Sequence, residues 1–583
     1  MIPEEEGASG FTLRACVIAI MLTVLLLVTS SYIALRMGAL PWPIIFSVVA
    51  AGALLQIVSR VSGKTSRHEV NVAQAGGTIG GLVASGVVFT IPGILYLQSQ
   101  GVNVSMPDFF MLAVVCVTAG VLGVLLSVPM RRVFVDEEKL PYPSGTAGAE
   151  VIKAETHLGK GTFYLMVALS LTGMFVLLRE LFFPAGWSFP LMPELGLVVA
   201  LYPMPMAIGI GYILGHKASV NSWFMGSLIG WMVLIPLFAA LSIAAPQAGA
   251  GMMQNAGMGM VMGAGIGFFA AYVLPRTRKI FAPLFRWKGM PWYTRLTPLF
   301  SVAAFAALSL AGMHPLGALI AVAGVWIMVG VAGMMTGETD IDPLEQFGII
   351  IGLVALGVFA ALNLHLDYLS AFLIVCFVSI ASAVAGDIGH DFKSAKIIGT
   401  RARDIIKIDM IAVIVAGVLA PLVLGFIVSA YGPEFFTPAM PAPQAQMVAG
   451  SIFGFAYPAA FYAGFLLSFG WVVLENATKR RAPVIPMVFG IGLFLGPLLG
   501  ILLAVGGVIR YATDKKKAGV FAGAGIILAA GVMGGEGIAG FGSKAMLVAG
   551  VPGMLSNALL FGIFIIVLIL AARMRRDENK VKK

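Results

Sequence analysis

The stretch Tyr368–Ala385 reads YLSAFLIVCFVSIASAVA, and the polar segment GDIGHDFKSAK follows it directly at Gly386–Lys396. A run of about 18 to 20 apolar residues is long enough for a helix to cross the hydrocarbon core of a bilayer. Similar runs recur along the whole chain, so the sequence predicts an all-α polytopic membrane protein. An ionised side chain at the bilayer centre costs about 2.5–3.5 kcal/mol. The polar segment therefore needs water, a partner or a substrate, and is a candidate functional site.

Composition and charge point to the same class of protein. Hydrophobic residues make up 59% of the chain and charged residues 11%, against about 25% charged residues in a soluble protein. The net charge of +10 could suggest nucleic acid, but Lys and Arg collect in alternate loops, as expected for loops on the cytoplasmic side of a membrane. The sequence predicts an integral, multi-pass protein with both termini in the cytoplasm and no nucleic-acid partner.

No cofactor or metal chemistry is visible in the sequence. The three cysteines, Cys16, Cys116 and Cys376, all fall within apolar runs and are too scattered to form a thiolate ligand set. Walker, H-E-x-x-H and dinucleotide motifs do not occur. We therefore expect no cofactor, no metal site and no catalytic residue. The 71 glycines, many in small-xxx-small spacing, predict close packing between helices.

Counting crossings from the basic loops gives about 16 transmembrane helices in two halves. Residues 1–275 form the first predicted eight-helix repeat, residues 276–295 a basic cytoplasmic linker, and residues 296–576 the second repeat. GLVASGV at Gly81–Val87 and GLVALGV at Gly352–Val358 match at six of seven positions and fall in the third crossing of each half. Because each half crosses an even number of times, we expect parallel repeats, an arrangement known in transporters.

One apolar segment, residues 483–509, does not fit this alternation because basic residues flank it on both sides. Pro497 and four nearby glycines would break a helix, so the segment would form a broken or re-entrant hairpin. The alternative is a single crossing that violates the charge rule. Irregular backbone at membrane depth is tolerated where protein or a wet cavity covers it, so we favour the hairpin.

The polar segment Gly386–Lys396 carries ionisable groups at helical spacing. Asp387 and Asp391 share one helix face at i and i+4, His390 lies beside them, and Lys393 follows. The functional interpretation is a cation, amine or proton site, because desolvated carboxylates and imidazole change charge readily. The alternative is a charged cytoplasmic loop whose lysines only set the topology, since the predicted crossing ends at residue 385.

A second polar segment, Pro141–Glu155, follows the fourth crossing of the first half and is the topological counterpart of the first. Tyr142 and Ser144, with the adjacent proline and glycine, open a helix whose N–H groups would face an anion. Glu150 and Lys153 follow on that helix. We interpret the segment as a substrate gate or, alternatively, as an ordinary surface helix on which Glu150 and Lys153 pair with each other.

Two more sets of polar residues lie within apolar surroundings. Glu536, in Gly-Gly-Glu-Gly at the predicted end of a crossing, either has a binding or coupling role or lies in an exposed outer turn. Asn71, Gln74 and Thr78 share one helix face at i, i+3 and i+7. They would line a cavity or hydrogen-bond to neighbouring helices.

Five segments in this order resemble the oligopeptide transporter superfamily, which includes the plant yellow stripe-like metal-chelate carriers. They are Asn71–Thr78 (NVAQAGGT), Phe89–Pro92 (FTIP), Tyr142–Ala147 (YPSGTA), Gly386–Ser394 (GDIGHDFKS) and Gly534–Ile538 (GGEGI). The resemblance implies a many-span secondary transporter, usually coupled to proton import, for small peptides, glutathione-like peptides or metal chelates. The short loops resemble those of a bacterial, inner-membrane member. His390 departs from the commoner family form, Gln-Asp-(Phe/Leu)-Lys-Thr-Gly.

The resulting hypothesis is proton-coupled import of a small peptide or peptide-like metal chelate. Glu150, Asp391 and Glu536 are candidate acids for the substrate amine or the coupling proton, and Lys153 and Lys393 are candidate partners for a substrate carboxylate. The lipid bilayer and protons are the other expected partners, and homo-oligomerisation stays open.

Two functions from other classes compete with transport by a carrier. A membrane-embedded, magnesium-dependent phosphate or diphosphate enzyme would need clustered carboxylates. Only Asp387 and Asp391 come close to such a cluster, so we expect no enzymatic activity. A channel would conduct without saturating, whereas a carrier saturates.

Overall fold

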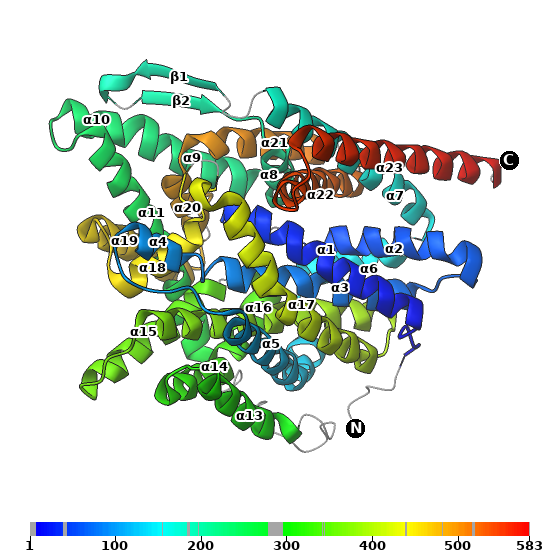
Figure 1. The fold of residues 1–583 in the computed structure, drawn as a ribbon, viewed down its shortest axis with the longest axis horizontal. Helices are drawn as coiled ribbons and strands as arrows, with labels where there is room; N and C mark the ends of the chain where they lie inside the picture. Colours follow the sequence, from blue (N-terminus) through cyan, green and yellow to red (C-terminus); the bar gives the residue numbers. More distant parts are fainter. Residues whose placement is uncertain are drawn as a thin grey trace. The chain divides into compact units, whose positions relative to one another are not determined.

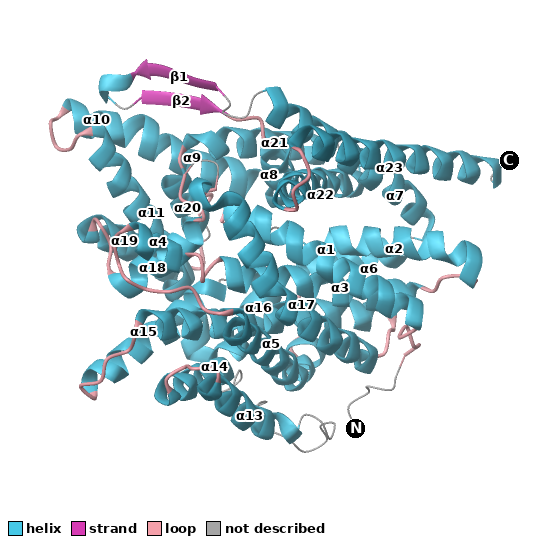
Figure 2. Cartoon of the chain, in the orientation of Figure 1, coloured by secondary structure: helices cyan, strands magenta, loops and turns pink. Residues whose placement is uncertain are grey.

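Helices make up almost all of the described chain, and its named strands form one hairpin (Figures 1 and 2). The computed structural model describes residues 7–38, 43–153, 155–182, 187–195, 197–277, 295–340, 342, 344–437, 440–480, 482–515 and 519–581. Within these ranges, 14 helices are long and apolar enough to cross a membrane, and three shorter apolar helices accompany them. The prediction of an all-α polytopic membrane protein is confirmed, with a count close to the predicted one.

The chain divides into two compact units, each built from two separate stretches of sequence. Unit 1 combines Met1–Thr162 with Arg276–Phe453, and unit 2 combines Phe163–Pro275 with Gly454–Lys583. Each predicted repeat therefore contributes its first part to unit 1 and its second part to unit 2. The parallel repeat stays a prediction, and this shared division is what two related halves would produce.

Unit 1 holds the longest buried helix of the described chain, α16 (Tyr368–Ile398), which packs against α3, α5, α6, α14 and α15 (Figure 1). Nearly every residue from Ser370 to Ser394 is buried, as expected for a helix that is apolar on all sides. The other elements of unit 1 are α1 (Leu13–Met37), α2 (Pro43–Ser62), α3 (Arg67–Val88), α4 (Gly93–Ser99), α5 (Phe109–Arg131), η1 (Arg132–Glu137), α6 (Pro143–Lys153), α13 (Thr297–Leu310), α14 (Pro315–Thr339), α15 (Leu344–Ala361), α17 (Ala402–Tyr431), η9 (Gly432–Glu434) and α18 (Pro443–Phe453).

The predicted end of this crossing at residue 385 is wrong, because α16 continues without a break to Ile398. The polar segment Gly386–Lys396 thus forms roughly the last three turns of a buried helix and is not a cytoplasmic loop. Its lysines reach outward to neighbouring oxygens: Lys393 Nζ donates to the Leu140 carbonyl (2.7 Å), and Lys396 Nζ to Asp136 Oδ1 (2.8 Å). Long side chains of this kind let the backbone stay buried while the charge reaches a polar partner.

Small residues allow α1 and α3 to approach each other closely. A Cβ atom at Gly80 of α3 would lie 2.0 Å from the Thr23 carbonyl oxygen of α1. Thr23 Oγ1 in turn donates to the Gly76 carbonyl of α3 at 2.8 Å. The close helix packing expected from the glycine spacing is therefore present at this pair.

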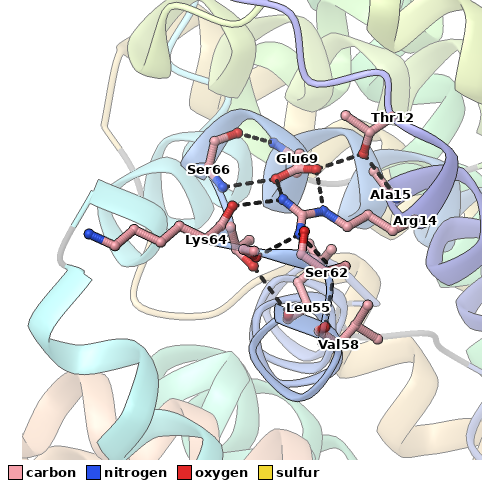
Figure 3. Close-up of polar contacts among 11 residues, drawn as sticks. Thr12, Arg14, Ala15, Leu55, Val58, Ser62, Lys64, Ser66 and Glu69 are labelled. Atoms are coloured by element: carbon pink, nitrogen blue, oxygen red, sulfur yellow. Dashed lines mark hydrogen bonds and ion pairs between the residues drawn. The ribbon is translucent and has the colours of Figure 1, made fainter. Parts of the chain in front are cut away.

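The N-terminus of α3 is held by a network around Glu69 (Figure 3). Ser66 and Glu69 form a capping box, in which each side chain accepts from the backbone N–H of the other. Arg14 of α1 donates to Glu69 Oε1 through Nε (2.6 Å) and to Oε2 through Nη2 (2.7 Å). Arg14 also donates to the carbonyls of Gly63 and Lys64, both at 2.8 Å. One guanidinium therefore ties α1 to the α2–α3 turn.

We expect Glu69→Ala to destabilise the protein by about 2 kcal/mol, because it removes the carboxylate that pairs with Arg14 and half of the capping box. Thermal unfolding of the detergent-solubilised protein would measure this change. The control is Glu137→Ala, which breaks the exposed Arg132–Glu137 pair and should cost less than about 1 kcal/mol. Equal melting temperatures for the two variants would contradict the assigned role of the network.

Unit 2 contains a β-hairpin that the sequence reading missed. β1 (Trp187–Met192) pairs antiparallel with β2 (Leu197–Leu201). The helix that follows the hairpin, α8 (Pro205–Ala218), begins only at Pro205. A short apolar run rich in Val and Leu fits a strand as well as a helix, so periodicity alone could not separate them.

The other elements of unit 2 are α7 (Glu155–Phe182), which enters unit 2 at Phe163, η2 (Pro193–Leu195), η3 (Ser219–Phe224), α9 (Met225–Ser227), η4 (Leu228–Leu234), α10 (Ile235–Ala240), α11 (Pro246–Phe268), η5 (Phe269–Val273), η6 (Leu274–Arg276), α19 (Pro458–Thr478), α20 (Pro486–Leu495), α21 (Pro497–Lys515), α22 (Gly519–Val548) and α23 (Gly553–Val581).

The segment 483–509 is broken where its glycines and proline predicted. Gly496, at φ 73° and ψ −169°, separates α20 from α21. The Leu493 carbonyl, whose helical donor would be the N–H that Pro497 lacks, accepts from Trp231 Nε1 (2.7 Å). The Gly492 carbonyl accepts from Ser227 Oγ (3.0 Å) as well as from the Gly496 N–H (3.1 Å). Protein donors thus replace water at this break, as a helix interruption at membrane depth requires.

Candidate substrate and coupling site

The candidate site lies in unit 1, where the last turns of α16 meet the polar face of α3. Asp391 on α16 is 1% exposed, and its Oδ1 accepts a hydrogen bond from Gln74 Nε2 at 2.8 Å. One turn on, Ser394 Oγ donates to Asn71 Oδ1 at 2.8 Å. Thr78, also fully buried, lies beside the Asp387 carboxylate. The predicted α3 face and the predicted α16 segment, more than 300 residues apart in the sequence, therefore contact each other.

The start of α6 lies on the other side of α16, at His390. The Gly145 N–H donates to His390 Nδ1 at 3.1 Å, and the Tyr142 ring meets the imidazole edge-on at a centroid distance of 5.4 Å. An Nδ1 that accepts a hydrogen bond carries no proton, so the neutral ring holds its proton on Nε2. That nitrogen lies 3.5 Å from Asp340 Oδ1. Burial raises the pKa of the Tyr142 hydroxyl, which donates to the Gly333 carbonyl.

The anion at the start of α6 belongs to the protein itself. Ser144 donates to Asp340 twice, from its backbone N (3.0 Å) and from Oγ (2.7 Å). Asp340 is the C-cap residue of α14, so this carboxylate joins the end of one helix to the N-terminus of another. An anion-facing helix start was expected here, and the structure places a carboxylate from unit 1 in that position.

Sequence reasoning missed four acidic residues near this site. Asp340, Asp342 and Glu345 lie where α14 ends and α15 begins, and Asp409 lies inside the apolar run of α17. Asp409 is 0% exposed, and its charge interacts with those of Asp387 and Asp391. Burial, together with the carboxylates of Glu345 and Asp387, raises the pKa of Asp342 well above its usual value. A carboxylate inside an apolar run was the signal available in the sequence for Asp409.

Several polar atoms of the site have no hydrogen-bond partner among the residues that the structure describes. They are Asp387 Oδ2, Asp391 Oδ2, both Asp409 carboxylate oxygens, Asn71 Nδ2 and Gln74 Oε1. A buried polar atom without a partner costs about 1–3 kcal/mol, and more when it is charged. The site therefore combines unsatisfied acceptors and an unsatisfied donor in a small buried region, which is what a site for a proton or a polar ligand requires.

The two charged residues predicted on α6 do not join this cluster. Glu150 and Lys153 lie on the exposed side of α6, where their charged groups are 3.6 Å apart and their side chains are 65% and 39% exposed. This is the i,i+3 pair that was the alternative interpretation of the segment. Lys393 is half-buried, and its Nζ binds the Leu140 carbonyl just before α6.

Glu536 lies in unit 2 and is neither at the end of a helix nor in an exposed turn. It sits in the middle of α22, is 0% exposed, and forms an ion pair with Arg179 Nη1 at 2.8 Å. The backbone N–H of Met206, in the first turn of α8, donates to its other oxygen at 2.8 Å. Arg179 also binds Glu180 (2.7 Å) and the Pro203 carbonyl (2.9 Å). Both carboxylate oxygens of Glu536 are thus satisfied by protein groups.

Comparison with known proteins assigns this architecture to a family. The family model described as "OPT oligopeptide transporter protein" matches residues 10–548, which cover both the α3–α16 site and the α22 motif. The chain belongs to the oligopeptide transporter family. The resemblance found in the five motifs is thereby confirmed, and with it an integral, multi-pass membrane protein.

Two curated relatives are similar in sequence to part of this oligopeptide transporter family member. The "Putative oligopeptide transporter" of Haemophilus influenzae is 27% identical over 205 residues, covering 33% of this chain and 30% of the relative. The "Probable metal-nicotianamine transporter YSL12" of Oryza sativa subsp. japonica is 30% identical over 129 residues, covering 20% and 18% respectively. The chain thus aligns with less than a third of the length of either relative.

Proposed function

We propose that this chain is a secondary transporter that imports a small peptide or a peptide-like metal chelate together with protons. Family membership supports the class of function, and the names of the two relatives support the two substrate classes. The bacterial inner membrane is the proposed location, with both termini in the cytoplasm. The observation that carries the proposal is the cluster of buried, incompletely bonded carboxylates on α16 and α17.

Three buried carboxylates in this cluster would repel one another if all were ionised. Asp387, Asp391 and Asp409 interact electrostatically with one another and keep oxygens without hydrogen bonds in the described part of the chain. Neighbouring like charges in a low-dielectric region favour protonation of at least one member. A cluster of this kind holds a proton or a cation whenever it is closed off from water, and this is the property that coupling requires.

Asp391 is the member best placed to carry the coupling proton. Gln74 holds its Oδ1, while Oδ2 has no partner in the described chain and can accept the proton. The amino group of a peptide, or the positive charge of a chelated metal, would then neutralise a second carboxylate. The loaded cluster is close to neutral, whereas an empty and ionised cluster is costly to bury.

This charge balance provides a simple rule for coupling. Rearrangement between outward-facing and inward-facing states requires the cluster to leave water, so the neutral, loaded form rearranges more easily than the ionised form. Substrate and proton then move together, and neither moves efficiently alone. Gln74 and Asn71 orient the cluster, because their amide groups bond directly to Asp391 and Ser394 of α16.

Uptake by the purified, reconstituted protein tests the proposal. Proteoliposomes with an alkaline interior are supplied with a labelled tripeptide or with a labelled iron–aminocarboxylate chelate. We expect saturable accumulation of at least one probe, accompanied by alkalinisation outside and abolished by a protonophore. Ohmic currents without saturation would support a channel instead, and magnesium-dependent release of phosphate from pyrophosphate would support an enzyme.

A further inference from the structure

The side of α16 that faces α14 and α15 carries a second row of polar groups. Ser379, Ser382 and Gly386 share one helix face at i, i+3 and i+7. A Cβ atom at Gly348 of α15 would lie 2.4 Å from Ser379 Oγ, so this face packs directly on α15. Positions 386 and 391 are about 140° apart around the helix axis. The row is therefore separate from the face on which Asp391 meets α3.

Two oxygen atoms from different elements converge on Gly386. A Cβ atom at this position would lie 2.7 Å from Thr336 Oγ1 and 2.7 Å from Asp342 Oδ2. Thr336 belongs to the last turn of α14, and Asp342 lies between α14 and α15. The two oxygens thus face the same point on α16, where only glycine leaves room for both.

The polar atoms of this row lack the partners that such groups have elsewhere in the protein. Thr29, on α1, is typical of a buried hydroxyl in a helix, because its Oγ1 donates to the Leu25 carbonyl of the preceding turn at 2.8 Å. The hydroxyls of Thr336, Ser379 and Ser382 and the Oδ1 atom of Asp342 have no partner in the described chain. Thr336 is only 2% exposed. Buried polar atoms of this kind indicate water or an ion at the site.

The charge at this junction is negative. Asp342 interacts electrostatically with the carboxylates of Glu345 and Asp387, and no Lys or Arg of the described chain pairs with any of the three. The C-terminal end of α14 adds the negative pole of its helix dipole. Both features favour a cation. Asp342 is also partly exposed, so that an ion can reach it from water.

We propose that an alkali-metal cation, sodium or potassium, binds beside Gly386 between Asp342 Oδ2 and Thr336 Oγ1. A carboxylate and a hydroxyl, with water as the remaining ligand, suit a hard ion of single charge. Calcium takes six to eight oxygen ligands, often from several carboxylates, and transition metals favour nitrogen or sulfur. The bound ion neutralises Asp342 and links the end of α14 to α16. This inference goes beyond the proposed function and does not depend on it.

Binding of radiolabelled sodium to the purified, full-length protein tests the proposal. The measurement is made at about pH 8, where carboxylates are ionised, with choline chloride keeping the ionic strength constant. We expect saturable binding that unlabelled NaCl and KCl displace, and a higher melting temperature in NaCl or KCl than in choline chloride. Thr336→Val keeps the shape of the side chain but removes one ligand, so it should weaken binding about tenfold. Asp342→Asn should abolish saturable binding.

The matched control is Thr29→Val, which removes a similarly buried hydroxyl from α1 and should leave binding unchanged. Thr336→Ser restores the hydroxyl and should keep most of the affinity, so the two Thr336 variants decide the matter if Asp342→Asn does not fold. The proposal is overturned if neither salt binds saturably or raises the melting temperature, or if the Thr336→Val and Asp342→Asn variants bind as the parent does. Displacement by MgCl₂ or CaCl₂ at lower concentrations than by NaCl and KCl would also overturn it. No substrate and no pH gradient is present, so failure of this site and failure of the transport proposal are distinguishable.

Discussion

Asp391→Asn is expected to abolish accumulation driven by a pH gradient while exchange of substrate across the membrane continues. One pH unit corresponds to about 1.36 kcal/mol. A transporter that moves one proton per substrate therefore supports about tenfold accumulation for each unit of pH gradient. The Asn side chain cannot carry the proton, so the internal and external substrate concentrations should become equal. The measurement is uptake and counterflow of the same labelled probe in proteoliposomes.

The substitution should leave the fold intact. Gln74 Nε2 donates to Oδ1 of the aspartate, and Asn retains an oxygen that can accept this bond. Removing a carboxylate that interacts with Asp387 and Asp409 also relieves repulsion in a buried region. We therefore expect the melting temperature of the variant to equal or exceed that of the parent protein.

The control for this prediction is Glu137→Gln, which neutralises an exposed carboxylate of η1 that is 53% accessible. Its uptake should match that of the parent protein. Full gradient-driven accumulation by Asp391→Asn would remove Asp391 from the coupling role. Asp409→Asn, on α17, would then be the next variant, because its carboxylate is fully buried and interacts with the same group.

Much of this site could be predicted from the sequence because helical spacing fixes which residues share a face. Asn71 and Gln74 were placed on one face of a helix, and both bond to α16. The end of α16 could not be predicted in the same way. Gly386 and Gly389 weaken a helix by about 1 kcal/mol each relative to Ala, so a local reading ends the helix there. The glycines instead make room for neighbours, such as Tyr142 against Gly389, which only the packed structure reveals.

The partners of charged residues that are distant in the sequence could not be predicted either. Asp340 gives no signal in a topology count, because acidic residues carry little weight in the charge rule, yet it caps α14 and accepts from the start of α6. Glu536 was treated as a lone carboxylate among glycines, yet its partner Arg179 lies 357 residues away in the sequence. A single sequence contains no information on which distant charge completes such a pair. A polar residue within an apolar run indicates a position that needs a partner, but it does not indicate which residue that partner is.

Breaking the Arg179–Glu536 pair with a single substitution is expected to lower the free energy of unfolding more than the substitutions at Glu69 or Asp391. The two side chains are 1% and 0% exposed, and their charged atoms are 2.8 Å apart. Removing one member of a buried ion pair typically costs about 3–5 kcal/mol, and Arg179 keeps its ion pair with Glu180 at 2.7 Å, which favours the lower end of this range. We expect Glu536→Ala to reach this range in thermal or denaturant unfolding of the solubilised protein. Glu536→Gln should cost less, because its side-chain oxygen can still accept from Arg179 or Met206.

A double substitution separates the charge from the packing. Replacing both members with apolar side chains, as in Arg179→Met with Glu536→Leu, removes both buried charges and should recover most of the stability lost in Glu536→Ala. Asp514→Ala is the matched control in the same unit, because it breaks the more exposed Arg510–Asp514 pair of α21 at an expected cost of less than about 1 kcal/mol. If Glu536→Ala were no less stable than Asp514→Ala, the buried pair would not hold α22 to α7. If the double variant were as unstable as Glu536→Ala, the loss would come from the Met206 hydrogen bond to Glu536 and from packing rather than from the ion pair.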